Sequence, residues 1–169
     1  MNNQKKVLIL NTGGTFNKYY EPINGQLNVL SSNKYIKDII KKAFKTTKKT
    51  KIKGVIFKDS LEINNDDRIN LVDTINQSKE NRIIIIHGTD TIDITAKFLN
   101  KHIKNKQIIL CGAMKPYSIE PVEATSNFMV AYGFLQSNKN NNIYISMHGL
   151  VKKHSKIKKN RTKGVFECQ

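Results

Sequence analysis

The chain has 169 residues, a formal net charge of +16 and a hydrophobic content of 38%. This length allows one domain with a real hydrophobic core and excludes two domains of ordinary size. The apolar run from Val7 to Leu10 is too short for a signal peptide, and no segment approaches the roughly 20 apolar residues of a membrane span. We therefore expect a single cytoplasmic domain over residues 1–169, with no membrane anchor.

The excess of lysine favours anionic partners but does not locate a site for them. Lysines run through residues 34–53 and gather again in residues 152–163, with no nucleic-acid-binding motif between them. Nucleic acid is therefore an alternative partner that the sequence does not favour. Cys111 and Cys168 form no CxxC pair and have no histidine beside them, so neither a disulfide framework nor a metal site is indicated.

Short β-branched runs alternate with longer segments of helical period, which predicts βαβ units. The expected strands, in chain order, are residues 6–10, 51–57, 82–87, 107–112 and 142–147. The expected helices cover residues 35–44, residues 69–75, a segment starting near Asp90, and Pro121 to about Leu135. Continuous apolar runs such as Ile83 to Ile86 are typical of strands covered on both faces. The pattern predicts a three-layer, doubly wound α/β fold with a mostly parallel sheet.

Ligands of such sheets bind at the carboxyl ends of the strands, where the first strand is followed by "TGGT", residues 12–15. This segment lacks the spacing of a dinucleotide loop and the lysine of a P-loop. Two interpretations stay open: a turn in which glycine supplies a positive φ, and a loop that presents Thr15 to a substrate.

The third predicted strand is followed by "HGTDT", residues 87–91. Asp90 fits a helix N-cap, with Thr89 making turn hydrogen bonds. A carboxylate beside a hydroxyl can equally orient a nucleophile or bind an ammonium group. His87 is more typical of a packed residue at a strand end than of a base.

Together these segments resemble the L-asparaginase family of the bacterial type, whose amino-terminal domain carries a TGGT loop and an HGTDT loop. "KDSLEINNDDR" resembles the family's segment with a substrate-binding serine, "GAMKPYS" resembles its "GAMRP" loop, and "KIKKNRTKGVFE" lies where the family has a lysine. The order of the segments is also the same. The resemblance implies a Rossmann- or flavodoxin-like sheet and a hydrolase with a threonine nucleophile.

The resemblance also implies a role for each matching residue. Thr15 would be the nucleophile, and Thr89, Asp90 and Lys159 would activate it and later a water molecule. A lysine acts as a base only if its pKa is lowered, and neighbouring lysines in residues 156–163 leave the choice of lysine open.

Further residues would bind substrate or close the site. Tyr19 and Tyr20 are joint candidates for the family's mobile lid tyrosine, although "EPINGQL" after them reads as a short loop. The residues implied in substrate binding are Gly14, Asp59, Ser60, Gly88, Thr89 and Asp90, with the amides near Gly14 and Gly88 as donors. Leu61 stands where some relatives have a glutamine, so recognition of a substrate ammonium group would depend on Asp90 and Glu62.

Family members are longer and carry a second, smaller domain, which completes the site of a partner subunit. This chain is expected to lack that domain and to self-associate, and its basic tail, about residues 152–169, is expected to be mobile without a ligand. The predicted function is hydrolysis of a side-chain amide, asparagine to aspartate and ammonia, without a metal or cofactor. The alternative is a weak or inactive relative that serves as an amino-acid-binding or amidotransferase-like module, with nucleic acid as its partner.

Overall fold

The computed structural model describes residues 6–44 and 50–169, so part of the lysine-rich segment 34–53 lies outside the described residues. Its centre is a six-stranded sheet in the order β4-β1-β5-β6-β7-β8, in which only β8 runs antiparallel to its neighbour. The strands are β1 (Val7–Gly13), β4 (Thr50–Lys58), β5 (Arg82–Ile86), β6 (Gln107–Cys111), β7 (Ile143–Met147) and β8 (Leu150–Lys153). The predicted strands are present, and the prediction of a mostly parallel sheet is confirmed.

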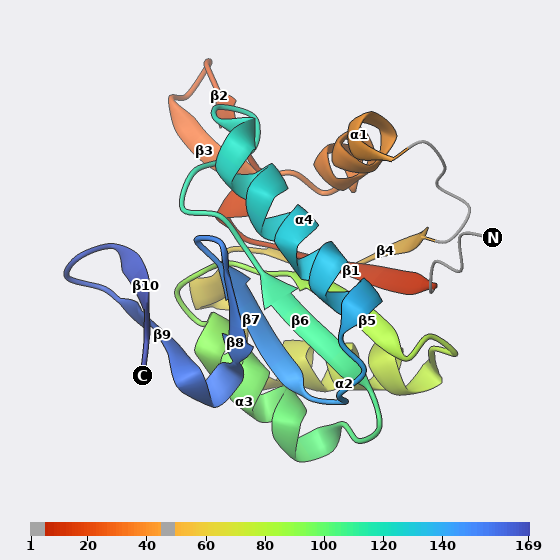
Figure 1. Cartoon of the computed structure of the whole chain (residues 1–169). Helices are drawn as coiled ribbons and strands as arrows, with labels where there is room; N and C mark the ends of the chain where they lie inside the picture. Colours follow the sequence, from red (N-terminus) through yellow and green to blue (C-terminus); the bar gives the residue numbers. More distant parts are fainter. Residues whose placement is uncertain (1–5, 45–49) are drawn as a thin grey trace.

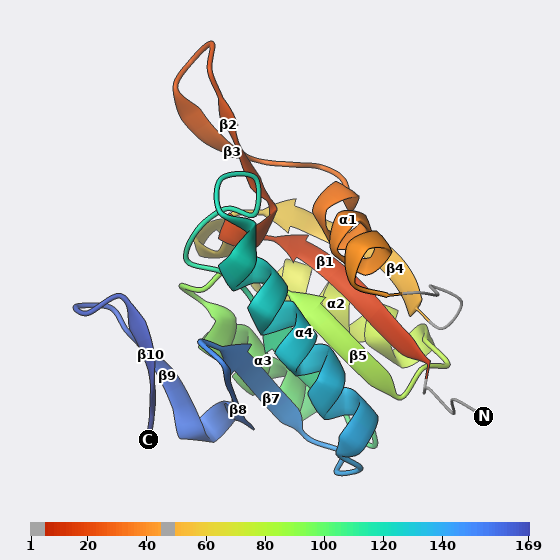
Figure 2. The same ribbon diagram turned by 45° about the horizontal axis from the view of Figure 1, so that its top comes forward.

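Helices cover both faces of this sheet (Figures 1 and 2). On one face pack α1 (Lys34–Ala43) and α4 (Pro121–Ser137), and on the other α2 (Asn65–Gln77) and α3 (Ile92–His102). Successive side chains of β1 lie on opposite faces of the sheet. Val7 and Ile9 belong to the core under α1 and α4, and Leu8 and Leu10 belong to the core under α2 and α3. The three-layer α/β fold expected from the sequence is confirmed.

Two hairpins extend from the main sheet and were not predicted. β2 (Lys18–Glu21) pairs with β3 (Gln26–Val29), and β9 (Ile157–Asn160) pairs with β10 (Val165–Cys168). Figure 1 shows the first at the top of the molecule and the second at its left. The segment "EPINGQL" is therefore the end of β2, a turn and the start of β3. These short strands are mostly half-buried or exposed, so no long apolar alternation marks them in the sequence.

The basic tail is folded in the structure. Ile157 and Phe166 are 1% and 5% exposed and pack into the α2 and α3 core, which attaches β9 and β10 to the domain. Within the described residues no helix is both long and apolar enough to cross a membrane. The same part of the chain contains no group of three or more His, Cys, Asp or Glu that could hold a metal ion.

Candidate active site

Three loops that follow β1, β4 and β5 are in direct contact. A Cβ atom on Gly14 would lie 2.3 Å from the Cα of Gly88, and one on Gly88 would lie 2.6 Å from the Oγ of Ser60. Only residues without a side chain permit this approach. Gly13 and Gly14 have φ angles of 96° and 72°, so the predicted glycine turn with positive φ is confirmed.

The amide of Gly14 is engaged within the protein. Its N–H donates to the carbonyl oxygen of Lys58 at 2.9 Å, and its carbonyl accepts from the N–H of Asn17 at 3.0 Å. The hydrogen bond to Lys58 joins the loop after β1 to the end of β4, so the N–H of Gly14 itself is not free to donate to a substrate. The N–H of Gly88 has no hydrogen-bond partner among the described residues and is free to donate.

Thr15 begins a short 3-10 turn, Thr15–Asn17, directly after the two glycines. It is half-buried, whereas the next residue, Phe16, is fully buried and fixes the turn to the core. Thr12 has a different position, because its hydroxyl is buried and donates to the carbonyl of Ile86 at 2.7 Å. Because Gly14 contacts Gly88, the residues that follow them, Thr15 and Thr89, start from adjacent backbone positions.

Thr89, Asp90 and Lys159 form what we term the catalytic cluster. The Nζ of Lys159 donates to the Oγ1 of Thr89 and to the Oδ1 of Asp90, in each case at 2.8 Å. The Lys159 side chain is 13% exposed and that of Asp90 is 38% exposed. Lys159 reaches this position because β9 is held by the buried Ile157, and Arg161 adds a hydrogen bond of 2.6 Å to the carbonyl of Asp90.

The other lysines of this segment, all within the described residues, make no hydrogen bond or ion pair with Thr89 or Asp90, although Lys158 lines a cavity next to them. Lys156 and Lys158 are exposed, and Lys163 pairs with Glu167 at 3.0 Å. The contacts with Thr89 and Asp90 thus single out Lys159 among the lysines that the sequence left open.

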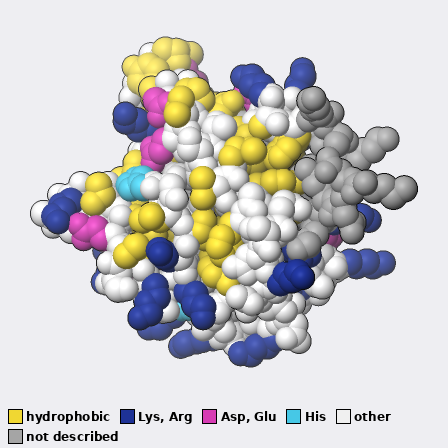
Figure 3. All heavy atoms as spheres, in the orientation of Figure 1, with side chains coloured by type: hydrophobic (Ala, Val, Ile, Leu, Met, Phe, Trp, Pro, Cys, Tyr) yellow, Lys and Arg dark blue, Asp and Glu magenta, His cyan; other side chains and the backbone are white. Residues whose placement is uncertain are grey.

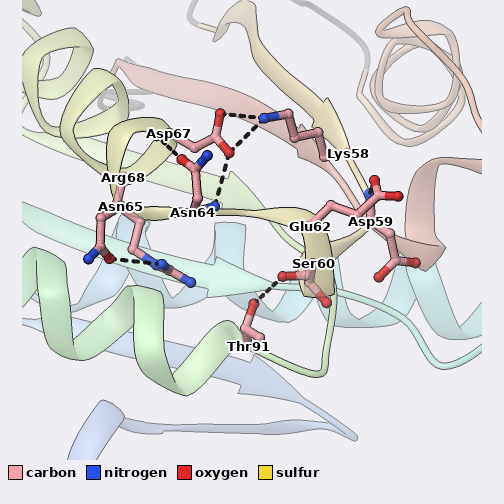
Figure 4. A network of polar contacts seen from close by, with 9 residues as sticks. All are labelled: Lys58, Asp59, Ser60, Glu62, Asn64, Asn65, Asp67, Arg68 and Thr91. Atoms are coloured by element: carbon pink, nitrogen blue, oxygen red, sulfur yellow. Dashed lines mark hydrogen bonds and ion pairs between the residues drawn. The ribbon is translucent and has the colours of Figure 1, made fainter.

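The loop after β5 also corrects one interpretation of Asp90. The N-cap of α3 is Thr91, not Asp90, and its side chain makes no capping hydrogen bond. The hydroxyl of Thr91 instead donates to the carbonyl of Ser60 at 2.7 Å, which holds the loops after β4 and β5 together (Figure 4). The carboxylate of Asp90 is therefore directed to Lys159 and not to a helix end.

The loop that carries Ser60 is stabilised by a capping box. The carboxylate of Asp59 accepts from the N–H of Leu61 at 3.1 Å, and the carboxylate of Glu62 accepts from the N–H of Asp59 at 3.2 Å. Asp59 also pairs with Lys18 at 2.6 Å. Ser60 itself is 1% exposed, and Figure 4 shows it between this capping box and Thr91. Both acidic side chains are occupied in shaping this turn.

Ion pairing and burial have opposite effects on the pKa of Asp59. Burial acts to raise the pKa of its carboxyl, but hydrogen bonds from Lys18 and from the N–H of Leu61 outweigh it, so the pKa lies below its usual value. Asp59 is consequently ionised at neutral pH. Lys18 was not singled out in the sequence, where it is one lysine among many and lies far from Asp59 along the chain.

His87 is a buried structural residue. It is fully buried, and its Nδ1 lies 2.8 Å from the carbonyl oxygen of Gly88, so Nδ1 carries the proton. Burial lowers its pKa to about 4, so the ring is neutral at pH 7. The buried ring packs at the end of β5, next to the loop that carries Thr89 and Asp90, in agreement with the prediction that His87 packs at the strand end.

Tyr19 and Tyr20 lie on β2, in what we term the tyrosine hairpin, residues 18–29. Tyr19 is half-buried and Tyr20 is 54% exposed. The base of the hairpin is attached through Lys18, whose carbonyl accepts from the hydroxyl of Ser118 at 2.9 Å. The "GAMKPYS" segment thus contacts the start of the tyrosine hairpin, a role for Ser118 that no local sequence signal indicates.

These loops bring together chemically complementary groups at one edge of the sheet. A cavity of about 390 Å³, lined in part by Asp90, Lys159 and Arg161, lies beside the catalytic cluster. Two threonine hydroxyls, a carboxylate and an ammonium group there are suited to attack on a carbonyl carbon with transfer of a proton.

Comparison with known families agrees with this architecture. Residues 6–167 match the family model described as the N-terminal domain of asparaginase. A glutaminase-asparaginase of Acinetobacter glutaminasificans is 32% identical over 82 residues, which are 47% of this chain and 25% of that protein.

Solved structures share the fold. The thermostable L-asparaginase from Thermococcus kodakarensis superposes with a TM-score of 0.81 at 25% identity, over 96% of this chain and 51% of that one. L-asparaginase I from Vibrio cholerae gives a TM-score of 0.83 at 20% identity, over 98% and 51% of the two chains. The chain thus spans about half the length of these proteins.

Proposed function

Because the chain belongs to the asparaginase family, we propose that it is an amidohydrolase that converts a side-chain amide into a carboxylate and ammonia. The observation that carries the proposal is the pair of 2.8 Å contacts from Lys159 to Thr89 and Asp90. They assemble proton-transfer groups beside the loop that carries Thr15.

In the proposed reaction the hydroxyl oxygen of Thr15 attacks the amide carbon, and its proton passes to the catalytic cluster. The carbon–nitrogen bond then breaks, the leaving nitrogen takes up a proton, and ammonia departs from an acyl-enzyme ester. A water molecule gives its proton to the cluster, attacks the ester and releases the acid, and Thr15 regains its proton. We assign the N–H of Gly88, which has no hydrogen-bond partner among the described residues, the stabilisation of the oxyanion in both steps.

Within the cluster, Lys159 donates to both the hydroxyl of Thr89 and the carboxylate of Asp90, so we assign Lys159 and Thr89 the relay of the proton. We assign Asp90 the orientation of Lys159 and a contact with the ammonium group of the substrate.

We propose asparagine as the substrate, with glutamine and peptide amides as the alternatives to be measured. Ser60 would contact the substrate carboxylate. Leu61 is 72% exposed beside Ser60 and offers no hydrogen bond. Asp90 and Glu62 each use one carboxylate oxygen in a contact within the described residues, so we assign the ammonium group to their second oxygens and expect modest discrimination between amide substrates.

Ammonia release from asparagine and glutamine tests the proposal in wild type, Thr15→Ala and Thr15→Ser. We expect Thr15→Ala to lose at least about 10³-fold in rate, since it removes the nucleophile, and Thr15→Ser to retain part of it. Circular dichroism controls for folding. Equal rates in wild type and Thr15→Ala would contradict the mechanism.

We also propose that the chain self-associates. Large apolar side chains are exposed around the site, including Leu61, Ile94 at 49% and Ile119 at 60%. Exposed apolar side chains that gather into one patch are typical of contact surfaces. Solution mass by light scattering, measured on the sample used for ammonia release, would relate activity to assembly; a strictly monomeric active species would contradict self-association.

A further inference from the structure

A groove outside the catalytic cluster lies between α1 and the loop that leads into α4. Its volume is about 610 Å³. The hydroxyl of Tyr117 donates to the carboxylate of Asp38 at 2.5 Å, and the ring of Tyr117 lies 5.2 Å from that of Tyr35. The two tyrosine rings therefore form the floor of the groove. The hydrogen bond from Tyr117 to Asp38 joins the loop before α4 to α1.

One wall of the groove carries uncompensated positive charge. Lys34, Lys37 and Lys41 follow each other at helical spacing along α1 and are exposed. None of their ammonium groups forms an ion pair or hydrogen bond with another residue in segments 6–44 and 50–169, whereas Lys42 pairs with Asp38 at 2.8 Å. In Figure 3, dark-blue side chains stand along the upper edge of the molecule, where α1 lies.

We propose that this α1 groove binds single-stranded nucleic acid. A base would stack on the half-buried ring of Tyr35, supported from behind by Tyr117. Successive phosphates would contact Lys34, Lys37 and Lys41. Aromatic platforms beside a row of cations are the combination by which proteins hold single strands without reading their sequence.

The shape of the groove favours a single strand over other anions. The three lysines extend over roughly 10 Å of helix axis, which suits consecutive phosphates better than the phosphates of one free nucleotide. A second groove of about 290 Å³ shares Lys42 and Tyr117 with the first and extends it toward α4, as a path for an elongated ligand. A flat anionic membrane would contact the lysines but leave the aromatic floor unused. The net charge of +16 attracts any polyanion to the surface.

The test measures binding of a fluorescein-labelled single-stranded RNA of about 12 nucleotides by fluorescence polarisation over a range of salt concentrations. Lys37→Glu/Lys41→Glu should weaken binding about tenfold or more and reduce the salt slope by roughly 1.4, the value for two phosphate contacts in a single strand. Tyr35→Leu should weaken it about tenfold while Tyr35→Phe, which keeps the ring, should not. Tyr117 is left intact because its ring also packs on Phe16, next to Thr15.

The matched control is Lys97→Glu/Lys101→Glu, which makes the same change in charge at the same spacing on the exposed side of α3. Equal weakening by both pairs of substitutions would overturn the proposal, because the net charge alone would then explain binding. Tighter binding of AMP than of the RNA would also overturn it. Thermal melting checks that each variant folds, and Lys37→Gln/Lys41→Gln provides the same readout if the charge reversal unfolds the protein.

Discussion

The catalytic cluster and the tyrosine hairpin differ in how they are held. Lys159 is bonded to both Thr89 and Asp90, and its strand is anchored by buried residues. The tyrosine hairpin is attached at its base by Lys18, while Ile23 at its turn is 93% exposed. One part of the proposed site is therefore held by several contacts, and the other has few contacts beyond its base.

This difference indicates separate roles for the catalytic cluster and the tyrosine hairpin. Proton transfer needs fixed geometry, because a small displacement of a catalytic group costs rate. A lid must open and close, so its contacts must be few and weak. We infer that the catalytic cluster provides the chemistry and that the tyrosine hairpin controls access to it, and each of the following predictions tests one side of this comparison.

The largest effect is expected at Lys159. Lys159→Met keeps much of the side-chain length but removes the amino group that contacts Thr89 and Asp90. Loss of a general base should lower kcat for ammonia release by roughly 10²–10⁴-fold. Lys163→Met is the control, because it removes the same charge from an exposed pair with Glu167 and should have little effect. An equal loss of kcat in both variants would show that the positive charge of this segment matters, and not the contacts of Lys159 with Thr89 and Asp90.

A smaller effect is expected from Gly14→Ala, with Gly25→Ala as its counterpart in the tyrosine hairpin. Both glycines have positive φ, 72° and 68°. A Cβ on Gly14 meets the backbone of Gly88 at 2.3 Å, whereas one on Gly25 finds nothing nearer than the hydroxyl of Tyr20 at 3.9 Å. We expect about 3 kcal/mol of destabilisation for Gly14→Ala and about 1 kcal/mol for Gly25→Ala. Thermal unfolding measures both, and similar melting temperatures would contradict the packing argument.

Sequence periodicity predicted five of the six strands of the sheet and its four helices because their side chains are buried in regular patterns. The edge strand β8 was not predicted, since none of its residues is fully buried. Ile83 to Ile86 are fully buried on both faces of β5, and such runs are visible without any structure. The tyrosine hairpin and the β9–β10 hairpin were missed because their short strands present polar, exposed residues. Their positions depend on single anchors such as Ile157 and Phe166, which no periodic pattern reveals.

The proposed site was foreseen in its residue types but not in its contacts. The resemblance implied Thr89, Asp90 and Lys159, while the contacts that distinguish Lys159 from its neighbouring lysines required the fold, since they depend on how β9 packs. The capping box that occupies Asp59 is local, yet its ion pair with Lys18 joins segments that are distant in sequence. Long-range pairs of this kind have no signature in a single sequence.

The buried ring of His87 makes the folding stability of the protein depend on pH. Its pKa is about 4 in the folded protein against 6.5 for a free histidine, so stability is unaffected above pH 6.5 and falls as the pH drops from 6.5 to 4. The shift corresponds to a loss of at most about 3 kcal/mol over this range. His87→Gln removes the titrating ring, so its melting temperature should fall less between pH 7 and pH 4 than that of wild type. Parallel curves for the two proteins would contradict this assignment.

The smallest effect is expected at the base of the tyrosine hairpin, where Lys18→Met breaks the ion pair with Asp59. Because the pair is partly exposed, we expect a loss of about 0.7 kcal/mol, which would speed hydrogen exchange of the hairpin amides roughly threefold. Exchange in β9 should not change, since the catalytic cluster does not depend on Lys18. Lys58→Met, which breaks the neighbouring pair with Asp67, is the control and should leave the hairpin unaffected.

The same contact should respond to acid. The pKa of Asp59 lies below its usual value of 3.8, so the ion pair contributes fully above that pH and is lost as the pH falls through the lowered pKa. Wild type and Lys18→Met should therefore differ in hairpin exchange at pH 6 and become alike well below about pH 4. If the difference persisted in acid, Lys18 would be acting through its packing and not through its charge, and if exchange in β9 also rose, the hairpin and the catalytic cluster would move as one unit.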